Sequence, residues 1–240
     1  MTMPTPIVPV STASGGMPMP TSLRSGTIAY RGADGVETGR ERFELIAHPG
    51  GHILRAMCEI DAPALVRDVT LAMDAAWRPL DGFCRIHLAG RCAAAQWFDV
   101  EDGMVRVAGR LEGRSVPEQR IATTGRLPYL GLHPLQGDAL ITMLRGTDQP
   151  GRFLPIAAVT NSVSPNGDEA LGTQAMTIDV AFVGETQVTV TAGSFPARRY
   201  ALRWRADWPP ADLWVRADGV FLRMHWAWIE EWYELAAIHG

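Results

Sequence analysis

The chain has 240 residues and a mass of 26.2 kDa, with 22 basic residues, 26 acidic residues and a net charge of −4. Hydrophobic residues make up 47% of it, which is enough for a packed core and excludes a wholly disordered protein. The small acidic excess argues against nucleic acid as a partner, because binding to phosphates requires positive charge. All the basic residues are arginine, so a lysine Schiff base and a P-loop lysine are both excluded.

The 24 glycines and 17 prolines indicate a chain that turns often, which argues against a helical bundle. The three cysteines, Cys58, Cys84 and Cys92, are odd in number and lack C-x-x-C spacing, so we expect small buried hydrophobes and neither a disulfide scaffold nor a zinc site. The sequence contains no run of about 18 apolar residues, so we predict no membrane span. It also lacks, before Arg24, the basic region with which a signal peptide begins. We therefore expect a cytoplasmic protein.

Residues 1–22 form a Pro-rich N-terminal arm, whose prolines disfavour a helix and cannot join a central sheet. Two interpretations remain open for this arm: a disordered tail, or an ordered segment that packs on a barrel mouth or on a second subunit of a homo-oligomer. We expect residues 23–240 to form a single β-barrel-like domain, since the sequence contains no linker and no internal repeat.

Alternation of apolar and polar residues with period two predicts about a dozen short strands. The predicted strands are Thr27–Arg31, Arg40–Ala47, His52–Ile60, Arg67–Trp77, Phe83–Leu88, Ala93–Val100, Met104–Leu111, Phe153–Thr160, Met176–Val183, Gln187–Thr191, Ala197–Arg205, Leu213–Ala217, Val220–Trp228 and Ile229–Leu235. Asp-Gly pairs, which favour hairpin turns, stand at Asp34-Gly35, Asp81-Gly82, Asp102-Gly103 and Asp218-Gly219. The expected fold is mainly β: an antiparallel β half-barrel or barrel.

One helix is predicted, over Pro134–Arg145. Pro134 suits a first helical turn, and Gly146 suits the C-terminal cap. Its apolar stripe consists of Leu135, Ala139, Leu140, Met143 and Leu144. Because the concave face of such a sheet would otherwise be open to water, we expect the helix to lie on that face and the ligand site to lie between the two.

The second half of the chain carries short motifs that support this fold. Gly184-Glu185 is followed by Ala192-Gly193-Ser194-Phe195 and then by Leu213-Trp214. Over roughly residues 125–235, this pattern resembles uncharacterised bacterial β-sheet proteins whose fold is similar to that of the periplasmic lipoprotein carriers. The resemblance implies an open antiparallel half-barrel wrapped over a helix, and it supplies no catalytic residues.

Motifs for nucleotide or serine-hydrolase chemistry are absent, so we expect no cofactor. His48 and His52 flank a Pro-Gly-Gly turn, so they do not predict a metal site. His133 precedes the helix, where the helix dipole would lower its pKa and keep the imidazole neutral. It is the first candidate acid–base residue, or else a capping or packing residue. Glu185 is the second candidate, or a turn residue.

Aromatic residues and one further histidine are the candidate ligand-binding residues. The set consists of Tyr129, Trp97, Tyr200, Trp204, Trp226 and His225. His225 shares a strand face with Arg223, which is either a solvated face or a polar lumen suited to a carboxylate or phenolate. Most of the tryptophans are equally well explained as core residues. We place the site between the helix start and the aromatic faces, where unpaired N–H groups would favour an anionic or carbonyl oxygen.

Three functions are compatible with these features. The first is a soluble binding protein for an apolar or aromatic small molecule held in a barrel cavity. The second is a cofactor-independent lyase, isomerase, hydratase or cyclase acting on such a molecule by acid–base chemistry. The third is a structural or oligomerisation module, with the arm as a connector. Cavity size separates the third from the others, and an isolated ionisable group facing the cavity separates the enzyme from the binder.

Overall fold

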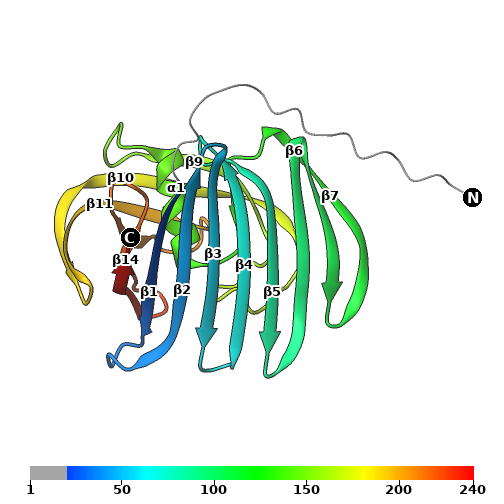
Figure 1. Ribbon diagram of the computed structural model, residues 1–240, viewed down its shortest axis with the longest axis horizontal. Helices are drawn as coiled ribbons and strands as arrows, with labels where there is room; N and C mark the ends of the chain where they lie inside the picture. Colours follow the sequence, from blue (N-terminus) through cyan, green and yellow to red (C-terminus); the bar gives the residue numbers. More distant parts are fainter. Residues whose placement is uncertain (1–20) are drawn as a thin grey trace, which may run out of the picture.

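The computed structural model describes residues 21–240, which form one large curved sheet and one α-helix (Figure 1). The predicted N-terminal arm lies, up to residue 20, outside the described residues. The strands are β1 (Ser22–Arg31), β2 (Glu37–His48), β3 (Gly51–Ile60), β4 (Leu65–Asp74), β5 (Pro79–Leu88), β6 (Arg91–Leu111), β7 (Arg114–Arg126), β8 (Tyr129–Gly131), β9 (Phe153–Thr160), β10 (Gln174–Val190), β11 (Gly193–Arg203), β12 (Ala211–Val215), β13 (Phe221–Trp226) and β14 (Glu231–His239). Helix α1 spans Leu135–Arg145.

The sheet is an antiparallel meander in which β1 pairs with β14, so that the two ends of the described chain meet in its middle. Its order is β7-β6-β5-β4-β3-β2-β1-β14-β13-β12-β11-β10-β9-β8, and β8 and β9 are its one parallel pair within the described residues. The edge strands β7 and β8 are not paired with each other, so the predicted half-barrel is confirmed in its open form.

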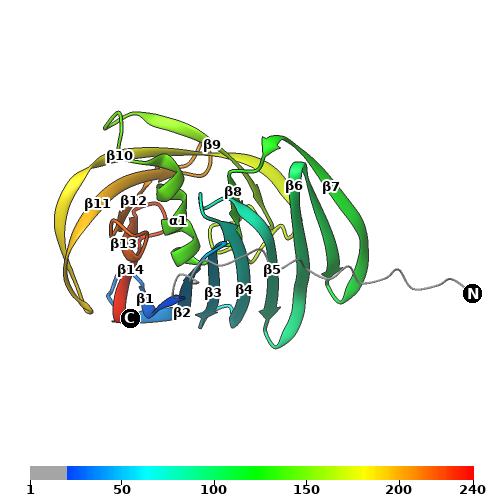
Figure 2. The ribbon, with the colours of Figure 1, turned by 45° about the horizontal axis from the view of Figure 1, so that its top comes forward.

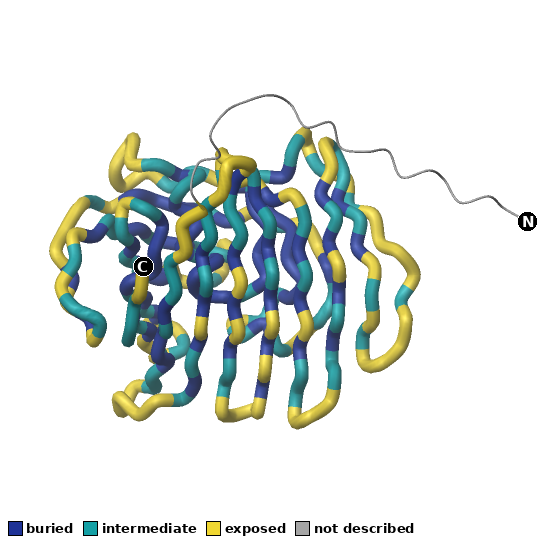
Figure 3. The backbone as a smooth tube through the Cα atoms, viewed as in Figure 1, coloured by how far each residue is buried: buried dark blue, intermediate teal, exposed yellow. Residues whose placement is uncertain are grey.

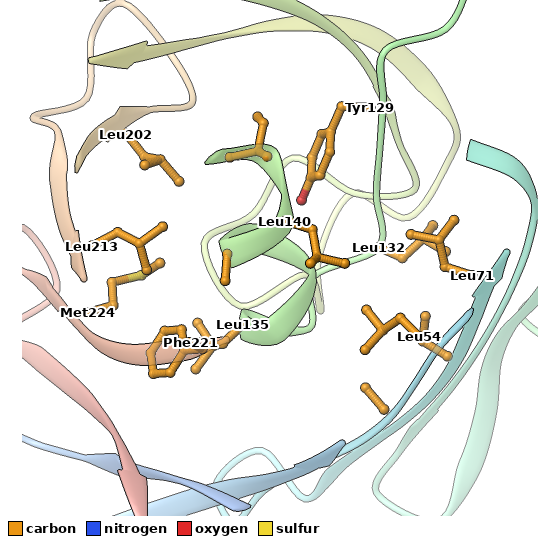
Figure 4. Packing of buried hydrophobic residues seen from close by; sticks show 14 of the residues in the cluster. Leu54, Leu71, Tyr129, Leu132, Leu135, Leu140, Leu202, Leu213, Phe221 and Met224 are labelled. Carbon is orange, nitrogen blue, oxygen red and sulfur yellow. The ribbon is translucent and has the colours of Figure 1, made fainter. Parts of the chain in front are cut away.

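Helix α1 lies inside the curve of the sheet (Figure 2). Strands β10 to β14 pass along one side of it, and β3 to β5 lie on the other. Apolar side chains from both parts of the sheet point toward the helix, among them Leu54 and Leu71 from one side and Leu213 and Met224 from the other (Figure 4). The core therefore forms around the helix, as the predicted concave location requires.

Strict alternation along the strands explains how the sheet buries one face. In β4, Val69, Leu71 and Met73 are buried, while the residues between them are more exposed. Buried positions line the interior, and the hairpin turns are exposed (Figure 3). Apolar burial of this kind contributes about 25 cal/mol per Å² and is the main source of stability for such a sheet.

The helix is buried on more than the predicted stripe because it is enclosed by the sheet. Gln136, Thr142 and Arg145 are buried, whereas Met143 and Leu144 of the predicted stripe are only partly buried. The Arg145 guanidinium donates to the carbonyl oxygens of Val180, Asp148, Gln149 and Arg152. Gly146 ends the helix with a φ of 64°, a conformation that favours glycine, as predicted.

Several predicted boundaries are wrong because the strands are longer than the turn signals suggested. Asp34-Gly35 and Asp218-Gly219 stand at turns, but Asp81-Gly82 lies inside β5 and Asp102-Gly103 inside β6. At Asp102-Gly103 the pairing with β7 shifts register, so the glycine, with a φ of 77°, serves a bulge and not a hairpin. Strand β7 was not predicted, because its side chains are mostly exposed on both faces and lack alternation.

Residues 161–173, called the crossing segment below, connect β9 to β10 and tie the two ends of the open sheet together. Gln119 of β7 donates to the Thr173 carbonyl oxygen at 2.7 Å, and Gln96 of β6 donates to the Thr173 hydroxyl at 3.2 Å. At the other end of the segment, the amide of Asn161 lies 3.3 Å from the Cys84 sulfur on β5. Side chains, not ladder hydrogen bonds, thus link these regions.

Candidate functional site

Glu41 of β2 caps the N-terminus of α1 from inside the sheet. Its carboxylate accepts hydrogen bonds from the backbone N–H of Leu135 at 2.7 Å and of Gln136 at 3.0 Å, and from the Tyr30 hydroxyl at 3.1 Å. The residue is fully buried, and burial raises its pKa, while the two backbone N–H groups and Tyr30 oppose that shift. The positive end of the helix dipole favours the carboxylate at this position.

This cap corrects the expected ligand chemistry at the helix start. The N–H groups of Leu135 and Gln136, predicted to be free for an anionic or carbonyl oxygen, are already bonded to Glu41. An external anion would therefore meet an internal carboxylate in place of free donors.

Arg67 of β4 is the buried cation beneath the helix start. It is 2% exposed, and its guanidinium donates to the carbonyl oxygens of His133 and Asn166. Gly167 packs against the same group with a φ of 63°, and a Cβ there would lie 2.5 Å from His133 Cγ and 2.6 Å from Arg67 Nη2. Arg67 thus holds the chain before α1 and the crossing segment together.

His133 lies beside this arginine, with a φ of 71°. Its Nε2 is 3.2 Å from the Ser162 carbonyl oxygen, so that nitrogen carries the proton and Nδ1 is the acceptor. Burial and the positive charge of Arg67 lower the pKa of His133 to about 3. A neutral imidazole was expected from the helix dipole, whereas its causes in the structure are burial and the charge of Arg67. Such a low pKa makes the His133 ring a weak base.

Tyr129 and Asp138 form a hydrogen-bonded pair between β8 and the first turn of α1. The Tyr129 hydroxyl donates to Asp138 Oδ1 at 3.0 Å. Burial raises the pKa of Asp138 to about 7, and the negative charge of Glu41 adds to this shift. The hydrogen bond from Tyr129 and the positive charge of Arg67 act in the opposite direction. The carboxyl therefore changes charge near neutral pH, which suits it to reversible proton transfer or to binding a cation.

A pocket lies between the start of α1 and the sheet. Its apolar lining includes Leu135, Ala158, Met176, Ile178, Met224 and Tyr233. Three tryptophans complete the wall: the ring centroids of Trp204 and Trp226 are 4.9 Å apart, and those of Trp208 and Trp226 are 5.4 Å apart. Trp226 Nε1 is bonded to the Pro209 carbonyl oxygen at 2.9 Å, which fixes its orientation.

Polar groups line the pocket as well. Tyr129, His133 and Asp138 come from the helix start and β8, and the crossing segment adds Ser162 and Ser164. The arrangement can hold a molecule with an apolar body and one polar end, since a few placed polar groups in an apolar pocket fix orientation.

The fold brings four of the eight candidate residues to this pocket: Tyr129, His133, Trp204 and Trp226. The other four are not among its lining residues. Tyr200 is 1% exposed and packs in the core against Phe182, with ring centroids 5.3 Å apart.

Trp97, His225 and Glu185 lie away from the pocket, on more exposed positions. Trp97 is 50% exposed on β6, and His225 stacks on Trp232 with ring centroids 3.7 Å apart. The Glu185 side chain is 73% exposed and 3.7 Å from Arg198. The turn considered for Glu185 is wrong, because the residue lies inside β10.

Sequence reasoning missed Glu41, Arg67 and Asp138. A signal was present for two of them: Glu41 shares strand parity with Phe43, and Arg67 shares parity with Val69, so both occupy inward positions. Charged residues at inward positions are rare and are paired or functional when they occur.

Within residues 21–240, no group of three His, Cys, Asp or Glu side chains is placed to hold a metal ion. The same residues include no helix with the length and apolar character needed to cross a membrane. Cys58 and Cys84 are buried, and Cys92 is partly buried.

The fold and the pocket define an open antiparallel β half-barrel with a helix on its concave face and a cavity beside that helix. A beta-barrel-like protein of the domain of unknown function DUF1849 from Brucella abortus has a similar structure: TM-score 0.56, 13% identity, 90% of this chain and 96% of that chain covered. A putative exported protein with a YmcC-like fold from Bacteroides fragilis aligns at TM-score 0.33 and 12% identity, covering 90% and 95% of the two chains. No family model and no curated protein matches the sequence. The structural similarity to the Brucella abortus protein shows the β-barrel-like fold and nothing about function.

Proposed function

We propose that the chain is a binding protein for a small molecule with an apolar or aromatic body, which occupies the pocket beside α1. The observation that carries the proposal is the combination of the Trp204, Trp208 and Trp226 wall with the hydrogen-bonded polar pair of Tyr129 and Asp138 in the same pocket. Burying an aromatic body against this wall is favourable at about 25 cal/mol per Å² of apolar area removed from water.

Binding of the neutral aromatic probe N-phenyl-1-naphthylamine, followed by its fluorescence, tests the proposal. We expect saturable binding that Trp204→Leu weakens by about tenfold, because the variant removes part of the apolar wall. Trp97→Leu is the matched control, since Trp97 is 50% exposed and lies outside the pocket. Equal loss in both variants, or no saturable binding to the unmodified protein, contradicts the proposal.

The second candidate function is a cofactor-independent lyase, isomerase, hydratase or cyclase. It is favoured by the carboxyl of Asp138, whose pKa of about 7 matches that of a general acid or base at neutral pH. In this case Asp138 with Tyr129 takes the acid–base role that the sequence assigned to His133 and Glu185.

Exchange of the α-hydrogens of 1-tetralone in deuterated water, followed by proton NMR, tests this second function. An enzyme of this class is expected to accelerate the exchange, and Asp138→Asn is expected to remove the acceleration. Exchange at the uncatalysed rate leaves the binding protein as the supported function.

Two further proposals concern the architecture of the half-barrel and the cellular compartment of the protein. We propose that the half-barrel is related in architecture to the periplasmic lipoprotein carriers, on the basis of the Gly184-Glu185 and Leu213-Trp214 motifs and the helix on the concave face. We propose the cytoplasm as its compartment, supported by the free thiols of Cys58, Cys84 and Cys92. Fractionation of the source cells, with the protein followed by antibody, tests the compartment.

A further inference from the structure

Among the ionisable groups that line the pocket, Asp138 is the acid without a cationic partner. These groups are Tyr129, His133, Asp138, Arg205 and Tyr233. Arg205 is paired with Asp207 at 3.0 Å, and the Tyr233 hydroxyl is bonded to Glu231. His133 is neutral because of its low pKa. Among the described residues, the hydrogen-bond partner of Asp138 is Tyr129, and no Arg or His is paired with it.

The surroundings of Asp138 do not neutralise its charge. Glu41 adds a second carboxyl at the helix start and uses the N–H groups of Leu135 and Gln136. Arg67 is the nearby buried cation, with its guanidinium bonded to the carbonyl oxygens of His133 and Asn166, and its charge acts on Asp138 in the direction opposite to that of Glu41. Because the charges of Glu41 and Arg67 oppose each other, Asp138 is the charge left over, and this part of the pocket favours a positive charge over a negative one.

The aromatic wall already attracts one cation. The Arg205 guanidinium carbon lies 5.1 Å from the centroid of the Trp208 ring, within the range of a cation–π interaction. Trp226 packs against both Trp208 and Trp204 and so continues the same wall. An organic cation with an aromatic or apolar body is thus matched by both parts of the pocket.

We infer that the pocket selects ligands whose polar end is a protonated amine, with the ammonium group at Asp138 and the apolar body against Trp204 and Trp226. This inference rests on the proposed binding function and names its ligand class. It replaces the anionic or carbonyl oxygen that the helix start had suggested.

Affinity for an amine depends on the protonation of Asp138. The groups that face this carboxyl from the surrounding elements are Tyr129 of β8, Glu41 of β2, Arg67 of β4 and Tyr233 of β14. Since the pKa of Asp138 is about 7, its charge develops as the pH rises through neutrality, while a primary amine stays protonated. Amine affinity therefore increases with pH in this window, and the affinity of a neutral analogue does not.

Calorimetric titration with three matched probes tests the inference: 1-naphthylmethylamine, 1-naphthalenemethanol and 1-naphthoate. At about pH 8, where Asp138 is charged, we expect the amine to bind about tenfold or more tighter than the alcohol, and the carboxylate to bind most weakly. Asp138→Asn keeps the size of the side chain and an oxygen for Tyr129, and it is expected to abolish the preference, so that the amine and the alcohol bind with affinities within about twofold of each other.

The outcomes separate this inference from the proposed function. If the alcohol binds as tightly as the amine, the selection for amines is overturned and the binding function stands. If the amine preference persists in Asp138→Asn, the role of Asp138 is overturned. If none of the probes binds, both fail. Should the variant not fold, the unmodified protein decides: amine affinity that does not rise between about pH 6 and about pH 8 overturns the inference.

Discussion

At the scale of single residues, Glu41 is the group on which the helix position depends most directly. Its two oxygens accept from Leu135, Gln136 and Tyr30, and all of these donors lose their partner if the carboxylate is removed. An unpaired buried donor costs about 1–3 kcal/mol, which is more than a typical hydrogen bond contributes.

We expect Glu41→Gln to lower the free energy of unfolding by about 1–3 kcal/mol, because an amide group would place an N–H₂ against backbone donors. Urea unfolding measures the change. Glu44→Gln on the same strand is the control, since its side chain is 46% exposed and the loss of a surface pair is expected to cost less than about 0.5 kcal/mol. Equal effects of the two variants would contradict a capping role for Glu41.

His133 is expected to make the protein less stable in acid. Its folded pKa is about 3 and its unfolded value is about 6.5, so the unfolded state binds the proton first as the pH falls. The neutral ring's contribution is therefore present above the unfolded value and lost as the pH falls toward 3. Asp138 acts in the opposite direction, since its folded pKa is raised to about 7 and its protonation favours the folded state.

Urea unfolding across this pH range isolates the contribution of His133. His133→Asn removes the titrating ring, and asparagine tolerates the φ of 71°, so the variant is expected to lose less stability than the unmodified protein between about pH 6 and about pH 4. His239→Asn, at an exposed position on β14, is expected to retain the original pH profile. A His133→Asn profile that matches the original would show that the ring does not titrate as described.

At the scale of elements, the crossing segment owes its position to close contact at Gly167. We expect Gly167→Ala to destabilise the protein by about 1–3 kcal/mol, because its Cβ would overlap His133 and Arg67. Gly151→Ala is the matched control: that glycine also has a positive φ, 77°, but no atom lies within 4 Å of its Cβ position. The difference between the two unfolding free energies measures the contact, and no difference would contradict it.

Alternation of apolar and polar residues predicted the strands better than the Asp-Gly pairs predicted the turns. Alternation predicted β2 to β5 well, because one face of each strand packs on the core. It missed β7, which has little buried surface on either face. Two of the four Asp-Gly pairs lie within strands, because pairing with a neighbouring strand outweighs the local preference for a turn.

At the scale of the whole molecule, the open edge at β7 is expected to be the least protected part of the sheet. Its residues pair with β6 on one side alone, and most of them are exposed. In hydrogen exchange followed by mass spectrometry, peptides covering Arg114–Arg126 should exchange well before peptides covering β4, which is paired on both sides. Equal protection of the two strands would indicate that another surface covers β7 in solution.

The sequence alone determined the mainly β class and the helix with its Gly146 end, because these depend on local periodicity and local conformation. It grouped alternating side chains on common strand faces, but it left open which face lines the cavity. It also predicted that Tyr129, His133, Trp204 and Trp226 lie near one site. Only the tertiary structure decided the charge of that site. Glu41 meets the helix N-terminus across 94 residues, and Arg67 meets Asn166 across 99. Strand parity states which face a side chain occupies, but the partner it meets there depends on how the sheet curves around the helix.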